Sequence, residues 1–178
     1  MNKNAGKEKM EIIKATTSHL EELHQFAREN FMLTYAHLNT EENMRDYLQE
    51  SFSKEAFERE FDHPESEFHI IIENSEIVGY FKINFASAQT EEIYPNSLEI
   101  ERIYVSKNLK GQGIGREMIE KVKNLAITNN LDFIWLGVWE QNPKAIAFYE
   151  KMGFQPIDKH VFQLGKDAQT DLIMKLTI

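Results

Sequence analysis

Apolar residues at helical spacing predict three helices in the N-terminal part of the chain, after one short strand at 11–15. The longest helix is predicted over 18–34, where Ser18 and Glu21 have the spacing of a capping box. One face of this helix is apolar and carries Leu20, Leu23, Ala27 and Phe31. Two shorter helices are predicted over 41–52 and 54–61.

A hairpin is predicted next, because β-branched and aromatic residues dominate two neighbouring segments, 68–73 and 77–85. Residues 74–76 separate these segments and have the composition of a turn. The turn-like segment 86–97 then leads to a further strand at 98–105.

The strand at 98–105 carries charge where apolar residues are expected. Strict alternation places Leu98, Ile100, Arg102 and Tyr104 in one row, and Glu101, Ile103 and Val105 in the other. Arg102 and Glu101 therefore each interrupt an apolar row. One charge on each face is unusual in a central strand and makes this segment a candidate for function.

Helices and strands also alternate in the C-terminal half. A helix that begins near Ile114 has an apolar stripe of Ile114, Met118, Ile119, Val122, Leu125 and Ala126. After a strand at 133–138, a second helix begins at the N-cap Asn142, with Pro143 in its first turn, and ends at Gly153. A terminal strand pair is predicted over 160–164 and 171–176. The sum is an α/β fold, a mixed sheet with helices on both faces.

Composition limits the functional classes. The 178 residues are 42% hydrophobic and 28% charged, so we expect one globular domain over 11–178 after a flexible tail at 1–10. The 20 Lys and Arg against 29 Asp and Glu give a net charge of −9, which argues against a nucleic-acid-binding surface and is compatible with cationic ligands. The chain has no cysteine, which excludes a cysteine nucleophile. No apolar run approaches the ~20 residues of a membrane helix, and we expect a cytoplasmic protein.

A glycine-rich segment joins the strand at 98–105 to the next helix. Gly111, Gly113 and Gly115 allow a tight turn and leave backbone N–H groups unobstructed at the positive end of that helix, a combination typical of pyrophosphate sites. A P-loop fits poorly, because Arg116 follows Gly115 where a lysine is needed. The dinucleotide fingerprint also fits poorly, because its third glycine would stand at Arg116. A turn that merely joins strand and helix is the alternative.

Two motifs together resemble the GNAT superfamily of N-acetyltransferases. Lys110, Gly113 and Gly115 are similar to its acyl-CoA loop, with Lys110 in place of the usual Gln or Arg. Its second motif, a helix that ends in an aromatic pair, a basic residue and Gly-Phe, is matched by Asn142, Ala145, Phe148, Tyr149, Lys151, Met152, Gly153 and Phe154. The resemblance implies a mostly antiparallel sheet of about seven strands and acetyl-CoA as the co-substrate.

Segments 98–104, 134–140 and 170–174 further resemble the bacterial PaiA-type spermidine and spermine acetyltransferases. This likeness implies transfer of an acetyl group to a polyamine amine and suggests a homodimer. An acceptor amine on a protein, peptide or antibiotic stays open, as does a non-catalytic acyl-CoA sensor.

Acetyl transfer to an amine first requires the loss of an ammonium proton. An alkyl ammonium with a pKa of ~10.4 is neutral about once in several thousand molecules at neutral pH, a handicap of roughly 4 to 5 kcal/mol. Glu101 is our candidate, but an ordinary carboxylate with a pKa of ~4.3 is a weak base, so it would act through water or anchor the cation. A simple ion pair with a nearby Lys or Arg is the alternative, and Glu99 would replace Glu101 if a bulge shifted the register.

Because no cysteine is available as a nucleophile, we expect direct attack of the amine in a ternary complex. The resemblance assigns Tyr149 as the general acid for the departing thiolate. With ordinary pKa values of ~10 and ~8.5, this proton transfer is uphill by about 2 kcal/mol. A core tyrosine is the alternative, because Ala145, Phe148 and Met152 share its helix face.

The resemblance also implies the ligand contacts. Strand backbone that would bind the pantetheine arm is Ile103, Tyr104 and Val105. Pyrophosphate would be bound by Lys110, Gly111, Gln112, Gly113, Ile114, Gly115 and Arg116, and Asn142 would reach the CoA arm. The acceptor pocket is expected to be lined by Phe31, Tyr35, Glu99, Glu101 and Trp139. The six histidines have no metal-ligand spacing, so no metal is expected.

Overall fold

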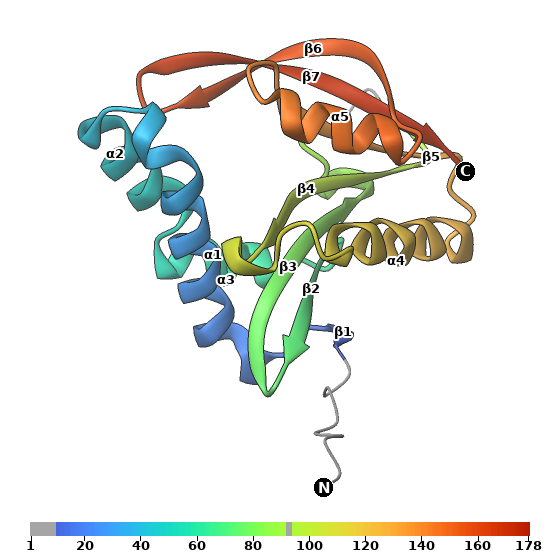
Figure 1. The fold of residues 1–178 in the computed structure, drawn as a ribbon, viewed down its shortest axis with the longest axis horizontal. Coiled ribbons are helices and arrows are strands. Elements are labelled where there is room, and N and C mark those ends of the chain that lie inside the picture. Colours follow the sequence, from blue (N-terminus) through green and yellow to red (C-terminus); the bar gives the residue numbers. More distant parts are fainter. Residues whose placement is uncertain (1–9, 92–93) are drawn as a thin grey trace, which may run out of the picture.

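The computed structural model describes residues 10–91 and 94–178, which fold into a sheet flanked by helices (Figure 1). The strands are β1 (Glu11–Lys14), β2 (Ser66–Glu73), β3 (Glu76–Phe85), β4 (Ser97–Val105), β5 (Phe133–Trp139), β6 (Gln155–Leu164) and β7 (Asp167–Thr177). The helices are α1 (Leu20–Tyr35), α2 (Glu41–Ser51), α3 (Lys54–Phe61), α4 (Ile114–Thr128) and α5 (Pro143–Lys151). The predicted tail lies outside the described residues except for Met10, which packs against the core.

All these strands form one sheet in the order β1-β2-β3-β4-β5-β7-β6. Neighbouring strands are antiparallel except for β4 and β5, which run parallel. The parallel pair needs a crossover, which α4 supplies between the two strands. The predicted α/β fold with a mostly antiparallel sheet is confirmed.

The helices cover the two faces of the sheet separately (Figure 1). On one face, α4 and α5 bury a core that includes Met118, Val122 and Tyr149. On the other face, α1, α2 and α3 bury a second, aromatic-rich core that includes Phe31, Phe52, Phe57 and Tyr80. Burial of apolar area in these two cores is the main favourable contribution to folding.

Two local predictions are refined by the structure. The β2–β3 turn consists of Asn74 and Ser75, whose φ angles of 52° and 65° match the right-handed twist of a two-residue hairpin. The predicted capping box of Ser18 and Glu21 is wrong, because a 3₁₀ turn precedes α1. The Thr16 N–H donates to His19 Nδ1 (3.0 Å) at the start of this turn.

Candidate active site

The parallel strands β4 and β5 separate part of the way along their length. They pair over 97–100 and 133–136, and no further pairing joins them in the described chain, although β4 runs on to Val105 and β5 to Trp139. Backbone N–H and C=O groups of β4 that face β5 therefore lie along an open edge of this gap. An extended ligand can pair with such an edge as a strand does.

A β-bulge interrupts β4 where the gap begins. Lys82 of β3 pairs with Arg102 but the next residue pairs with Ile100, so Glu101 has no residue opposite it. The bulge corrects the predicted rows of this strand. The face that packs on α4 carries Leu98, Ile100, Ile103 and Val105, whereas Arg102 and Tyr104 lie on the face toward α1.

The glycine-rich segment leads directly into the N-terminus of α4. Gly113 is the N-cap residue, and both Gly111 and Gly113 have left-handed φ angles, of 82° and 88°. A Cβ atom built on either one would meet nothing within 4 Å, so this cradle is open. Gly115 has a different reason to be glycine, since its Cβ would lie 3.1 Å from the Phe148 ring of α5. Gly115 is the second residue of α4 rather than part of the turn, and its expected contact with pyrophosphate stays a prediction.

The helix α5 places Tyr149 beneath this part of the sheet. Asn142 caps the helix through Oδ1, which accepts a hydrogen bond from the Ala145 N–H (3.2 Å), so this oxygen is already engaged. Tyr149 is 8% exposed and packs edge-on against Phe154. Burial, with a smaller contribution from nearby Tyr35, raises the pKa of Tyr149 and keeps its hydroxyl protonated at neutral pH.

Glu101 belongs to a network of buried charges. Its carboxylate lies 2.5 Å from Lys82 Nζ and 3.6 Å from an Arg102 nitrogen, and it accepts a hydrogen bond from Asn84 Nδ2 (2.6 Å). Burial alone would raise the pKa of Glu101, but the charges of Arg102 and Lys82 hold it below its ordinary value. The lower pKa makes Glu101 a weaker base than an ordinary carboxylate.

The same two cations are shared with α3. Glu60 accepts hydrogen bonds from Arg102 (2.7 and 3.1 Å) and from Lys82 (3.0 Å). The Arg102 guanidinium also stacks 4.6 Å from the centre of the Phe52 ring. Two carboxylates thus flank two buried cations.

Glu99 is a buried carboxylate that accepts hydrogen bonds from neutral groups. It accepts hydrogen bonds from Asn84 Nδ2 (3.0 Å) and from the backbone N–H and hydroxyl of Thr90 (2.8 and 2.5 Å). Burial raises the pKa of Glu99, and the nearby charge of Glu101 adds to this effect. The Asn84 amide therefore donates hydrogen bonds to both Glu99 and Glu101, the two carboxylates that the sequence makes candidates.

The aromatic residues proposed for the acceptor pocket differ in their surroundings. Phe31 is only 4% exposed, stacks on Tyr47 and packs at a tilt against Phe52 in the core, so its ring is covered. Tyr35 lies near Tyr104, Asp171 and Tyr149, and burial raises its pKa. Trp139 is half-buried at the end of β5, where its backbone pairs with Asp171.

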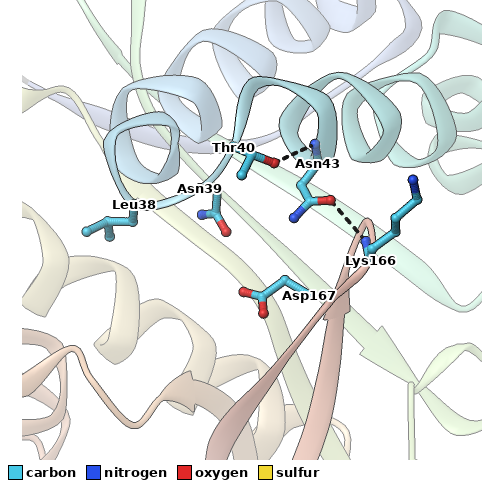
Figure 2. Close-up of a pocket in the computed structure, with 6 residues that line it drawn as sticks. All are labelled: Leu38, Asn39, Thr40, Asn43, Lys166 and Asp167. Atoms are coloured by element: carbon cyan, nitrogen blue, oxygen red, sulfur yellow. Dashed lines mark hydrogen bonds between the residues drawn. The ribbon is translucent and has the colours of Figure 1, made fainter.

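A pocket of about 260 Å³ lies between the start of α2 and the turn that joins β6 to β7, and Figure 2 shows the residues that line it. Asn43 Oδ1 accepts a hydrogen bond from the Lys166 N–H (3.2 Å), and Asn39 Oδ1 accepts one from Gln169 Nε2 (3.0 Å). Gly165 is required in the turn, because a Cβ there would lie 2.9 Å from Asn43 Cα. These contacts fix the β6–β7 turn and the start of β7 against the start of α2. A second pocket, of about 440 Å³, lies beside α3 and β3.

Sequence reasoning missed most partners of the candidate carboxylates. Lys82 and Asn84 were detectable in principle, since they interrupt the apolar segment of β3. Glu60, which shares Lys82 and Arg102 with Glu101, had no local signal, because only the tertiary fold brings it to these two cations. In residues 10–91 and 94–178, no group of three or more metal-ligating side chains could hold a metal ion, and no helix is long and apolar enough to cross a membrane.

Comparisons with known proteins agree with this geometry. Residues 21–154 match the family model of the acetyltransferase (GNAT) family. An uncharacterized N-acetyltransferase of Lactobacillus delbrueckii subsp. lactis is 34% identical over 93% of this chain and 96% of its own length. A spermidine N(1)-acetyltransferase of Thermoplasma acidophilum is 26% identical over 84% of this chain and 90% of its own.

Among solved structures, the fold is similar to that of the PaiA N-acetyltransferase from Thermoplasma acidophilum in complex with coenzyme A. The TM-score is 0.76 at 24% identity, covering 96% of this chain and 99% of the other. The chain therefore belongs to the acetyltransferase (GNAT) family and is an acyltransferase that uses acetyl-CoA as its co-substrate.

Proposed function

We propose that the protein transfers the acetyl group of acetyl-CoA to a primary amine of a polyamine such as spermidine. The observation that carries this proposal is the buried carboxylate Glu99 and its neighbour Glu101, on the face of the sheet away from α4 and beside the gap between β4 and β5. A polyamine is a small molecule with several positive charges, and carboxylates in a low-dielectric site attract it strongly. The likeness to a spermidine N(1)-acetyltransferase supports the same acceptor class.

Acetyl-CoA would bind along the open edge of β4. We propose that the backbone of Ile103 and Val105 pairs with the pantetheine arm, and that the cradle of Gly111 and Gly113 receives the pyrophosphate at the N-terminus of α4. The exposed cations Lys110 and Arg116 flank the cradle and would neutralise phosphate charge.

Tyr149 is proposed to protonate the departing thiolate. Its raised pKa makes full proton transfer costlier than ordinary pKa values imply. The hydroxyl would therefore begin as a hydrogen-bond donor to the sulfur and release its proton as negative charge develops there. Glu101, held by Lys82 and Arg102, is proposed to anchor the acceptor cation electrostatically rather than to accept its proton.

A panel of acceptors tests the proposal. Release of the CoA thiol from acetyl-CoA would be measured with spermidine, spermine, a lysine-containing peptide and an aminoglycoside at equal concentrations. We expect kcat/KM to be highest for a polyamine. A clear preference for the peptide or the aminoglycoside would reject the polyamine acceptor, and tight acetyl-CoA binding without acetylation of any amine would point to a sensor.

A further inference from the structure

The reaction needs a proton acceptor that Glu101 does not supply well. The Glu101 carboxylate is already engaged by Lys82, Asn84 and Arg102, and its pKa lies below the ordinary value. General-base catalysis is most efficient when the pKa of the base lies near the working pH. An imidazole close to the acceptor would meet this condition better than a paired carboxylate.

His160 of β6 lies between two carboxylates from different parts of the chain. Its Nδ1 is 2.7 Å from Oε1 of Glu91, in the segment that precedes β4. Its Nε2 is 3.6 Å from Oδ2 of Asp171 on β7, the residue paired with it in the strand register. With Nδ1–H donated to Glu91, the neutral imidazole carries its lone pair on Nε2. Glu91 thereby fixes the tautomer of His160 and orients the ring so that Nε2 lies on the side opposite Glu91.

The nitrogen Nε2 faces a position on β5 that has no side chain. A Cβ built on Gly137 would lie 3.2 Å from His160 Nε2 and 3.4 Å from Asp171 Oδ2. Gly137 itself is exposed, between two tryptophans, Trp135 and Trp139, on the same face of β5. The missing side chain therefore lets the His160 imidazole and the Asp171 carboxylate lie close over the exposed backbone of Gly137, at the surface where an acceptor can approach them.

Gly137 also stands where the gap between β4 and β5 begins. The last paired residue of β5 is Leu136, opposite Ile100, and Gly137 follows it. Glu99 pairs with Trp135, two residues before Gly137 and on the same face, so the Cα atoms of Glu99 and Gly137 are about 8 Å apart at parallel-sheet spacing. The imidazole, Asp171 and the β4 carboxylates thus border one region at the start of the gap.

We propose that His160 Nε2 is the general base that takes the proton from the acceptor ammonium, while Asp171 holds that ammonium and Glu91 positions the imidazole. This inference rests on the proposed function in requiring an amine acceptor, but not on which amine it is. In the described chain, the charged groups that face His160 from packed elements are Glu91 and Asp171. On β6 itself, Asp158 and Lys159 flank it, and Lys159 pairs with Glu140.

The ammonium gives one proton to His160 Nε2, the neutral nitrogen forms a bond to the thioester carbonyl carbon, and the carbon–sulfur bond then breaks. The thiolate takes a proton from Tyr149, and the second proton lost by the nitrogen restores the Tyr149 hydroxyl through solvent. His160, which is partly exposed, returns its proton to water, so one proton is released in each turnover.

The carboxylates of Asp171 and Glu91 raise the pKa of His160 above its ordinary value, against the opposing effect of burial. A bound ammonium beside Asp171 would offset this effect and favour the neutral imidazole that the reaction needs. The base would therefore become available when the acceptor binds.

The pH dependence of kcat/KM for spermidine tests the proposal in His160→Gln. For the unaltered enzyme, kcat/KM should rise with pH and reach a plateau above the pKa of His160. Near neutral pH, kcat/KM of the variant should be lower by about 100-fold or more, which is the usual contribution of a general base. Its rate should then rise about tenfold for each pH unit as free amine appears. A variant that retains the plateau and stays within a few-fold of the unaltered rate would overturn the proposal.

Glu91→Gln provides a second readout that does not depend on the stability of the first variant. Loss of the anionic partner lowers the pKa of His160, so the acidic limb of the profile should move to lower pH. An unmoved limb would contradict the proposal. His63→Gln, a histidine between α3 and β2 and outside this group, is the matched control and should keep both the limb and the plateau.

These experiments distinguish a failure of the His160 proposal from a failure of the proposed polyamine acceptor. If the unaltered enzyme acetylates another amine and not spermidine, the polyamine acceptor is refuted, and the same profiles with that amine decide the role of His160. If the enzyme acetylates spermidine and both variants keep the unaltered profile, only the His160 proposal is refuted. If it acetylates no amine, both proposals fail.

Discussion

Replacing Glu101 by glutamine should destabilise the fold. The substitution preserves the shape of the side chain but removes one of the two carboxylates that neutralise Lys82 and Arg102. Lys82 and Arg102 are 4% and 8% exposed, so water cannot replace the lost charge. Glu60 alone would then have to balance two buried cations.

The size of the effect follows from burial. Removal of one partner of a buried ion pair typically lowers the free energy of unfolding by roughly 3 to 5 kcal/mol, because the other charge is left uncompensated. Glu101 is 20% exposed at its side chain and Glu60 still contacts both cations, which places the expected loss near the lower limit, at about 3 kcal/mol. For a chain of this size, that corresponds to a fall in Tm of roughly 6 to 12 °C.

Urea denaturation of both proteins at several pH values measures this effect. Because the folded-state pKa of Glu101 is lowered, its stabilising contribution is present above the unfolded-state pKa and is lost as the pH falls through the folded-state pKa. The difference between Glu101→Gln and the unaltered chain should therefore shrink in acid.

A double-mutant cycle with Lys82→Met separates the ion pair from other effects. Removing both charges should cost less than the sum of the two single losses, with a coupling of about 1 kcal/mol or more. Additive losses, or a loss below about 0.5 kcal/mol for Glu101→Gln, would refute the buried network as described, because surface substitutions are usually that small.

Three further substitutions test other parts of the account. Gly113→Val places a β-branched residue at a φ of 88° inside the proposed phosphate cradle, so acetyl-CoA affinity measured by calorimetry should fall about tenfold or more, whereas normal binding would place the cofactor elsewhere. Gly165→Ala forces a Cβ to within 2.9 Å of Asn43 Cα at a left-handed φ, and thermal melting should show a loss of about 2 kcal/mol; an unchanged Tm would show that the turn adjusts freely. Tyr149→Phe should lower kcat by about 100-fold or more and leave the Kd for acetyl-CoA nearly unchanged, since it removes only the proton donor; unchanged turnover would exclude Tyr149 as the acid.

Local sequence signals predicted the elements of the fold well. The apolar stripe from Ile114 to Ala126 corresponds to α4, and Asn142 caps α5 as expected, because both signals depend on residues within one or two helical turns. The capping box at Ser18 failed for a related reason. Thr16, two residues earlier, has its own local partner in His19, and a 3₁₀ turn forms before the helix.

The site was predicted less completely, because its geometry depends on contacts distant in sequence. Strict alternation put Arg102 in the row of Leu98, but the bulge at Glu101 reverses the faces after it, and no sequence pattern located that bulge. Gly115 was interpreted as part of the turn, although its space is limited by Phe148 of another helix. His160 becomes a candidate only once the fold brings Glu91 and Asp171 beside it.

The central claim, that this chain acetylates polyamines with Tyr149 as the acid, is tested most directly by two measurements on one reaction mixture. Free CoA thiol would be followed with and without spermidine, and the spermidine product identified by mass spectrometry, for the unaltered enzyme and for Tyr149→Phe. The account predicts spermidine-dependent thiol release, acetylated spermidine in equal amount, and a collapse of both in the variant. Tight acetyl-CoA binding with no acetylated spermidine, or full activity in Tyr149→Phe, would contradict it.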